Sequence, residues 1–215
     1  MIYCHLSMSD GLVVVKTKYK NFSISGLPGA GSTVLGKHLA KHLGFQYYSG
    51  GDFMRQYAIE KGYFDPKKST HHDATVYPDD FDRQVDYGVR ERMTKGRGCV
   101  YESWLSGFLA QQVLGTFKIL VYCSDDAVRV DRIANRDDIT IAEAKTHIFT
   151  REQKNLKKWI KMYSKEWGEW VVKPGTLPKT EPTYFWRSEL YDLAIDTFKQ
   201  GKEETLELVL KSITR

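Results

Sequence analysis

Residues 23–40, SISGLPGAGSTVLGKHLA, decide the fold because they join a short apolar strand to an amphipathic helix through a glycine-rich turn. The spacing Gly26-x-x-x-x-Gly31, with Thr33 two residues on, is that of a phosphate-binding loop. Such a loop presents backbone N–H groups and a helix N-terminus to a polyphosphate. Ser32 occupies the position where these loops carry a lysine. The sequence therefore predicts a phosphate site without its usual charged side chain.

The rest of the chain alternates between apolar runs and helical patterns. Five short runs are predicted to be strands, at residues 20–25, 45–48, 98–103, 117–123 and 190–196. Helical patterns follow at 32–43, 52–60, 78–95, 125–138, 140–164 and up to residue 213. The order predicts an α/β protein with the P-loop NTPase fold, a parallel β-sheet of about five strands flanked by helices. Ligands of such sheets lie at the carboxyl ends of the strands.

Two segments have no clear period. Residues 63–78 are polar, and we interpret His71, His72 and Asp73 as part of a solvated loop, because adjacent histidines lack the spacing of a metal site. Residues 165–188 combine prolines with aromatics and are interpreted as an insertion or extended loop. We expect an N-terminal extension at 1–19 and one domain at 20–215.

Composition limits the functional class. With 41% apolar and 27% charged residues, the chain has the balance of a globular protein. Its net charge of +5 fits a phosphate-bearing partner but does not by itself indicate nucleic acid. We see neither a signal peptide nor an apolar stretch of about 20 residues, and three scattered cysteines suggest reduced thiols. We therefore expect a cytoplasmic protein without a membrane partner.

The missing lysine requires a substitute if the loop supports phosphoryl transfer, because one well-placed donor is worth roughly 3 kcal/mol. Lys37 is near in sequence, but five helical residues rotate it by roughly 140° and raise it by ~7.5 Å from Ser32. Arg132, Arg136 and Arg151 are better candidates because their planar guanidinium groups suit phosphate oxygens. A solvated helix face remains the alternative for each arginine.

Seven motifs in order resemble those of cytidylate kinases, particularly the compact archaeal type: SISGLPGAGST, FQYYSGGDFMR, FDRQVD, VYESWLSGFLA, RVDRIANRDDITIAEA, REQKNLKKW and YDLAIDT. The resemblance covers residues 20–210, with 165–188 outside it. It implies phosphoryl transfer from ATP with Mg²⁺ to CMP or dCMP, and a helical lid at about 132–165 that excludes water.

The resemblance also implies residue roles. The donor phosphates would lie on the loop, formed by Gly26, Leu27, Pro28, Gly29, Ala30, Gly31, Ser32 and Thr33, with Thr33 on Mg²⁺. Ser49, Asp52 and Arg55 match an SxGDxxR segment, in which Arg55 would bind the acceptor phosphate. Arg132, Arg136 and Arg151 match the lid arginines and would be catalytic.

Three positions depart from the family pattern. Trp104 replaces the arginine of an EGR or ESR triplet, and Asn155 and Lys158 replace the last two members of an RExxDxxR motif. We assign all three to acceptor binding. Trp104 could stack on a base, or it could be a rim or core aromatic, and both readings remain open.

Three functions are weighed. The leading one is a nucleoside monophosphate kinase that acts as a monomer on a nucleotide, without a nucleic acid partner. The alternative is a non-catalytic nucleotide-binding or regulatory protein, which the changes at Ser32, Trp104, Asn155 and Lys158 would favour. The third is RNA binding through the basic residues 151–165.

Overall fold

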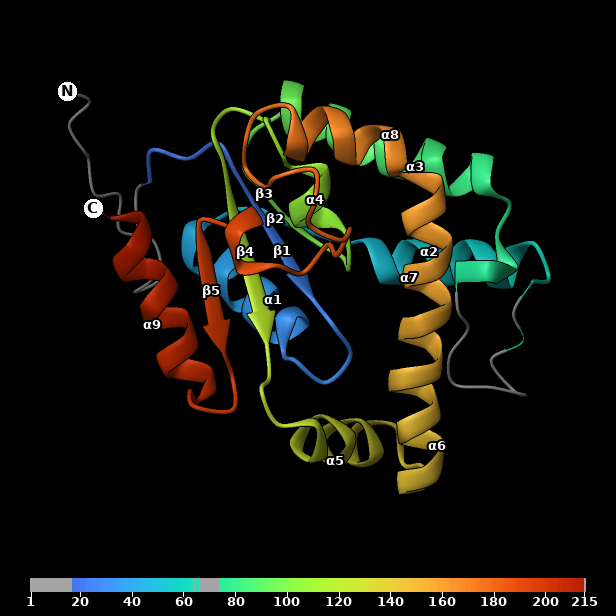
Figure 1. Cartoon of the computed structure of the whole chain (residues 1–215). Coiled ribbons are helices and arrows are strands. Elements are labelled where there is room, and N and C mark those ends of the chain that lie inside the picture. The colour runs from blue at the N-terminus through green and yellow to red at the C-terminus, as the bar shows by residue number, and fades with distance from the viewer. Residues whose placement is uncertain (1–16, 64, 66–73, 215) are drawn as a thin grey trace.

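The computed structural model describes residues 17–63, 65 and 74–214. The chain alternates between strands and helices along most of its length (Figure 1). The elements are β1 (Asn21–Gly26), α1 (Ser32–Leu43), β2 (Gln46–Ser49), α2 (Gly50–Glu60), η1 (Ala74–Val76), α3 (Asp79–Lys95), β3 (Cys99–Glu102), α4 (Ser106–Leu109), β4 (Thr116–Tyr122), α5 (Asp126–Asp137), α6 (Ile141–Lys145), η2 (Thr146–Thr150), α7 (Arg151–Met162), α8 (Ser164–Trp167), η3 (Gly168–Val172), η4 (Ser188–Leu190), β5 (Leu193–Asp196) and α9 (Lys202–Ile213). His71, His72 and Asp73 lie outside the described residues.

The strands form one parallel sheet in the order β2-β3-β1-β4-β5. Strand β1 is central, and Ile24 pairs with Glu102 of β3 and with Ile119 of β4. All six residues of β1 are buried, as expected for a strand between two covered faces. The predicted fold class is confirmed, and the loop after β1 opens at the carboxyl edge of the sheet.

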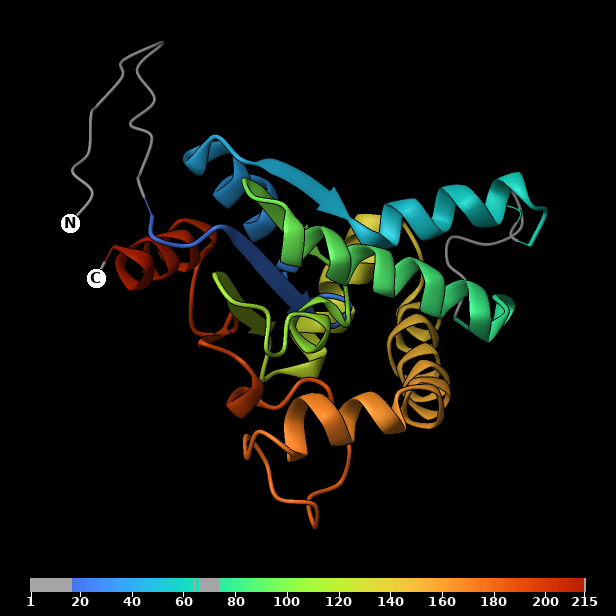
Figure 2. The same ribbon diagram turned by 90° about the horizontal axis from the view of Figure 1, so that it is seen from above.

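The two faces of β1 carry different side chains. Phe22 and Ile24 belong to the apolar core beneath α1 and α9, which Figure 2 shows on one side of the sheet. On the other face, the Ser25 hydroxyl accepts a hydrogen bond from the Gly107 N–H at 2.9 Å. Ser106 donates to the Ile24 carbonyl oxygen at 2.8 Å. Small hydroxyl residues therefore let the short helix α4 lie directly against the central strand.

The second core joins α3, α4, α7 and α8 to the chain that precedes β5. The interpretation of 165–188 as irregular is wrong for residues 165–172, which are helical in α8 and η3 because Trp167 and Val171, four residues apart, are both buried in this core. Residues 173–187 are irregular, as expected, yet Leu177, Phe185 and Trp186 are buried in the same core. Phe108 of α4 packs edge-on against Phe185, with ring centres 4.8 Å apart. The interpretation of 165–188 as an insertion stays a prediction, but its description as an extended loop misses that these side chains complete the core.

Helices α5 and α6 lie at one end of the molecule, and α7 runs from them to α8 (Figure 1). They have a small apolar cluster of their own, formed by Val130, Ile133, Ala134, Ala144 and Ile148. The predicted helix at 140–164 is interrupted by the π-helical turn η2, directly before Arg151. Within the described residues, no helix is both long and apolar enough to cross a membrane.

Candidate active site

The loop between β1 and α1 depends on glycine at two turns. Gly29 and Gly31 have φ angles of 80° and 95°, in the left-handed region where side chains are strained. A Cβ atom on Gly29 would lie 2.7 Å from the Arg129 carbonyl oxygen. Glycine at these positions therefore lets the loop turn tightly into the N-terminus of α1, which is the geometry that the phosphate-binding motif requires.

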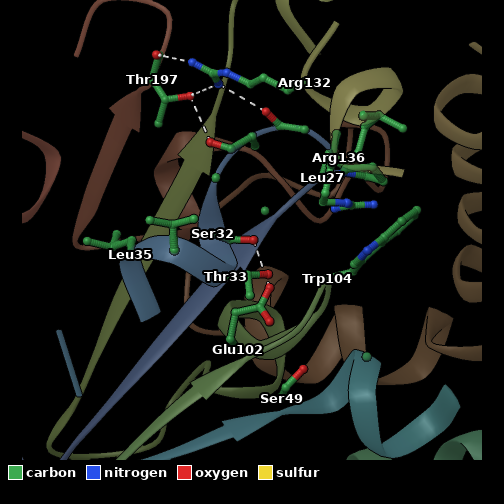
Figure 3. A pocket seen from close by; sticks show the side chains of 18 of the residues that line it. Leu27, Ser32, Thr33, Leu35, Ser49, Glu102, Trp104, Arg132, Arg136 and Thr197 are labelled. Carbon is green, nitrogen blue, oxygen red and sulfur yellow. Dashed lines mark hydrogen bonds between the residues drawn. The ribbon is translucent and has the colours of Figure 1, made fainter. Parts of the chain in front are cut away.

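Ser32, at the position where such loops carry a lysine, is hydrogen-bonded to the end of β3. Its hydroxyl is buried and donates to Oε1 of Glu102 at 2.8 Å (Figure 3). Tyr47 donates to the other oxygen of the same carboxylate at 3.2 Å. Burial raises the pKa of Glu102, while these two hydrogen bonds oppose the rise. Ser32 thus fixes the end of β3 against the loop.

A cavity of about 880 Å³ opens beside the loop. It brings together most of the predicted site: Gly26, Leu27, Pro28, Gly29, Ala30, Gly31, Ser32, Thr33, Ser49, Asp52, Arg55, Trp104, Arg132, Arg136 and Arg151 all line it. Gln200, Lys202 and Thr205 of the last connection and α9 close another side. The volume is that of a typical ligand pocket.

Arg132 is fixed against the back of the loop. Its Nη1 donates to the Gly29 carbonyl oxygen at 3.1 Å and to Oγ1 of Thr197 at 2.9 Å. Its Nη2 donates to the Thr197 carbonyl oxygen, also at 2.9 Å. Thr197 in turn donates to the Ala30 carbonyl oxygen (Figure 3). Arg132 therefore ties α5 and the end of β5 to the loop.

Arg136 of α5 and Arg151 of α7 also line the cavity. The Arg136 side chain is 54% exposed and pairs with Asp137 at 2.8 Å. The Arg151 guanidinium lies 4.9 Å from the centre of the Trp104 ring. Lys37 instead lies 5.9 Å from the Tyr47 ring and is not a lining residue of this cavity. Arg136 and Arg151 therefore both reach the cavity, whereas Lys37 does not.

The predicted acceptor residues lie at the start of α2. The Ser49 hydroxyl accepts a hydrogen bond from the Asp52 N–H at 3.1 Å and so caps this helix. Ser49, Asp52 in the first turn of α2 and Arg55 in the second all line the cavity.

Trp104 belongs to an aromatic cluster, as one of the two alternatives expects, and stacking on a base stays a prediction. Its ring packs edge-on against Trp159 and Trp186, with centres 5.6 and 6.0 Å apart. The Trp186 indole also donates to the Trp104 carbonyl oxygen at 2.7 Å. Trp104 nevertheless lines the cavity, so one face of this aromatic cluster is available to a ligand.

Comparison with known proteins decides the family. The family model for the cytidylate kinase-like family matches residues 21–199. The chain belongs to the cytidylate kinase-like family. It is 30% identical over 193 residues to the cytidylate kinase of Archaeoglobus fulgidus, covering 89% of this chain and 93% of that protein. The cytidylate kinase of Pyrococcus abyssi is 30% identical over 196 residues, with 89% and 92% covered. The predicted resemblance and, at the level of class, the predicted kinase are confirmed.

Solved structures support the fold of this family member. An uncharacterized protein from Eubacterium ventriosum has a TM-score of 0.60 at 12% identity, covering 91% of this chain and 98% of that one. A gluconokinase from Sinorhizobium meliloti has a TM-score of 0.54 at 14% identity, with 93% and 94% covered. At this identity the similarity concerns the fold alone.

Two residues assigned to the acceptor site from the family motif lie elsewhere. Asn155 and Lys158 are not among the residues that line the cavity. The Asn155 side-chain oxygen accepts a hydrogen bond from the Ala74 N–H at 2.6 Å. Lys158 donates to the carbonyl oxygens of Ala74 and Tyr77 and to Asp82. Both side chains connect α7 to the segment that begins α3.

Arg129 and Thr197, which hold the loop in place by hydrogen bonds, were not predicted. Arg129 is 7% exposed, donates to the Pro28 carbonyl oxygen at 3.1 Å and pairs with Glu152 of α7 at the same distance. Its position on one helical face with Arg132 and Arg136 was the available signal. Thr197 carried no signal of its own, because its role depends on the return of β5 to the loop.

Proposed function

We propose that the protein transfers a phosphoryl group from Mg-ATP to CMP or dCMP. The supporting observation is one cavity that is lined at once by the glycine loop, by Arg55 on the acceptor side and by Arg136 and Arg151 of the lid. A donor and an acceptor bound in one such cavity would be held together, which is the main requirement of phosphoryl transfer.

The residues present fit a magnesium nucleotide. Thr33 is exposed at the first turn of α1 and lines the cavity, so its hydroxyl is available as an oxygen ligand. Among the described residues, no group of three or more His, Cys, Asp or Glu side chains is placed to hold a metal. Thr33 and the nucleotide phosphates are therefore the expected ligands. Bound Mg²⁺ would supply charge neutralisation at the phosphates.

Arginine supplies the side-chain charge in this proposal. Because residues 26–33 contain no lysine or arginine, the loop contributes backbone N–H groups but no side-chain cation. Arg136 and Arg151 would bind the transferring group from the lid side, and Arg55 would bind the acceptor phosphate. Trp104 would contact the acceptor base with the face of its ring that lines the cavity.

The alternative function is nucleotide binding without transfer. The observation that favours it is the same hydrogen bond between Ser32 and Glu102, because it stabilises a loop that has no lysine. This protein would bind ATP through the loop backbone and would form no diphosphate with any acceptor.

Direct product analysis tests the proposal. The purified chain is incubated with Mg-ATP and CMP, dCMP, UMP or AMP, and the nucleotides are separated by chromatography. We expect CDP or dCDP, and their loss in an Arg55→Ala variant that still binds ATP by calorimetry. ATP binding by the wild type without a diphosphate from any acceptor would reject phosphoryl transfer in favour of the alternative.

A further inference from the structure

Helix α7 is bonded to the acceptor side of the molecule by two polar side chains. Lys158 is the centre of this contact, at 2.8 Å from the Ala74 carbonyl oxygen, 2.9 Å from that of Tyr77 and 2.7 Å from Asp82. Asn155, one turn earlier, accepts from the Ala74 N–H. The Lys158 side chain is 9% exposed and that of Asp82 is 5% exposed, so water competes little for these bonds.

Tyr77 continues the connection to α2. Its carbonyl oxygen is bound by Lys158, and its hydroxyl donates to the Met54 carbonyl oxygen at 2.7 Å. The rings of Tyr57 and Phe81 stack with their centres 3.8 Å apart, which joins α2 to α3 a second time. Met54 immediately precedes Arg55, so the acceptor-side arginine is part of the same bonded unit.

The other end of α7 carries Arg151. Seven helical residues separate Arg151 from Lys158, which is two turns and about 10.5 Å along the axis. Over this distance an α-helix moves as a rigid rod, because each turn is hydrogen-bonded to the next. A displacement of the segment at 74–82 is therefore transmitted to the start of α7, where the Arg151 guanidinium lies against Trp104.

We propose that Asn155 and Lys158 are positioning residues that make the acceptor side and Arg151 move as one body. Acceptor binding at Arg55 then brings Arg151 to the transferring phosphoryl group, and Arg151 is out of place when the acceptor site is empty. The proposal rests on the proposed function for its catalytic consequence, while the mechanical connection itself does not depend on turnover.

The first test is a Lys158→Met variant, with Lys157→Met as the matched control on the exposed face of the same helix. We expect the turnover of Lys158→Met with Mg-ATP and CMP to fall about 100-fold, because misplacing a catalytic group by about 1 Å has an effect of that order. Lys157→Met should be unchanged, and Lys158→Arg, which keeps the charge, should recover most of the turnover. If Lys158→Met does not fold, Asn155→Ala, which leaves every charge in place, is measured instead.

A double-mutant cycle separates positioning from general damage. If Lys158 acts through Arg151, adding Lys158→Met to an Arg151→Ala variant should lower turnover by no more than about threefold. If the losses of turnover in the two single variants multiply in the double variant, the proposal is overturned, because Lys158 then stabilises the fold without placing Arg151.

Amide hydrogen exchange measures the coupling between the acceptor side and the start of α7 without requiring catalysis. In the wild type, CMP should slow amide exchange at 50–60, at 74–82 and at 146–155, and in Lys158→Met the effect at 146–155 should disappear. If this pattern is found in a protein that forms no CDP, the proposed function fails and the mechanical coupling stands. If CMP leaves 146–155 unaffected in the wild type, the coupling is overturned whatever the turnover.

Discussion

Replacing Ser32 with lysine restores the residue that the glycine loop lacks and tests where the catalytic charge comes from. Ser32 is 6% exposed, and its hydroxyl is 2.8 Å from Oε1 of Glu102. The new ammonium would enter a space that already contains this carboxylate. Its nearest partner is therefore the buried Glu102, whose pKa it would lower below the raised value of the wild type.

The Ser32→Lys substitution would affect both the stability of the protein and its turnover. Loss of the serine hydrogen bond to a charged acceptor costs about 1.5–3 kcal/mol of stability, which an ion pair with Glu102 would offset. For catalysis, a preorganised donor missing from the wild type would be worth roughly 3 kcal/mol, or about 100-fold in turnover. If Arg136 and Arg151 already supply that charge, the lysine is redundant and turnover should change by less than about tenfold.

The assay is the initial rate of CDP formation at saturating Mg-ATP and CMP, compared among the wild type, Ser32→Lys and Ser32→Ala. Ser32→Ala isolates the loss of the hydrogen bond to Glu102. Urea unfolding of all three proteins gives the accompanying change in stability. A gain of about 100-fold or more in Ser32→Lys would refute the reasoning, because it would show that no arginine replaces the lysine.

Three other predictions test separate parts of the structure. Arg136→Ala and Arg151→Ala should each lower turnover by about 100-fold, whereas replacing the exposed Lys161 of α7 with alanine should not change it. Full activity in both arginine variants would refute the assigned roles. Gly29→Ala should abolish ATP binding in calorimetry, because a Cβ atom there would lie 2.7 Å from a backbone oxygen, while Gly88→Ala, which meets nothing within 4 Å, should bind normally. Burial raises the pKa of Asp86 to about 7. Its contribution to stability is thus fully present below about pH 4, where the unfolded carboxyl is also protonated, and is lost as the pH rises to 7, by up to about 4 kcal/mol; the free energy of unfolding should show this fall between about pH 4 and 7 in the wild type but not in Asp86→Asn.

The elements could be predicted from the sequence wherever local chemistry decides them. The glycine loop, the helix from Ser32 to Leu43 and the run at 117–123 follow from turn residues and continuous apolar patterns. The Ser49 cap on α2 is equally local, because the hydroxyl and its partner are three residues apart. The family motifs then predicted most of the residues that line the cavity.

The remaining features depend on contacts that are distant in sequence. Arg132 was expected to face the phosphates, but Thr197, 65 residues away, holds its guanidinium at the loop. Lys158 was assigned to the acceptor from its motif position, yet its three oxygen partners lie 76–84 residues away. Phe185 and Trp186 are buried without any helical or strand period, since an irregular segment has no repeat that identifies its inward face.

The contacts of Lys158 and Asn155 also determine which segments can be exchanged with a relative to make a hybrid protein. A hybrid that exchanges only residues 132–165 with those of a relative would separate both side chains from Ala74, Tyr77 and Asp82. The smallest exchangeable unit therefore consists of noncontiguous stretches, namely α2, residues 74–82 and α7. Recombination at a single crossover between residues 95 and 151 splits that unit, so substitutions at 155 and 158 should be inherited together with compatible residues at 74–82.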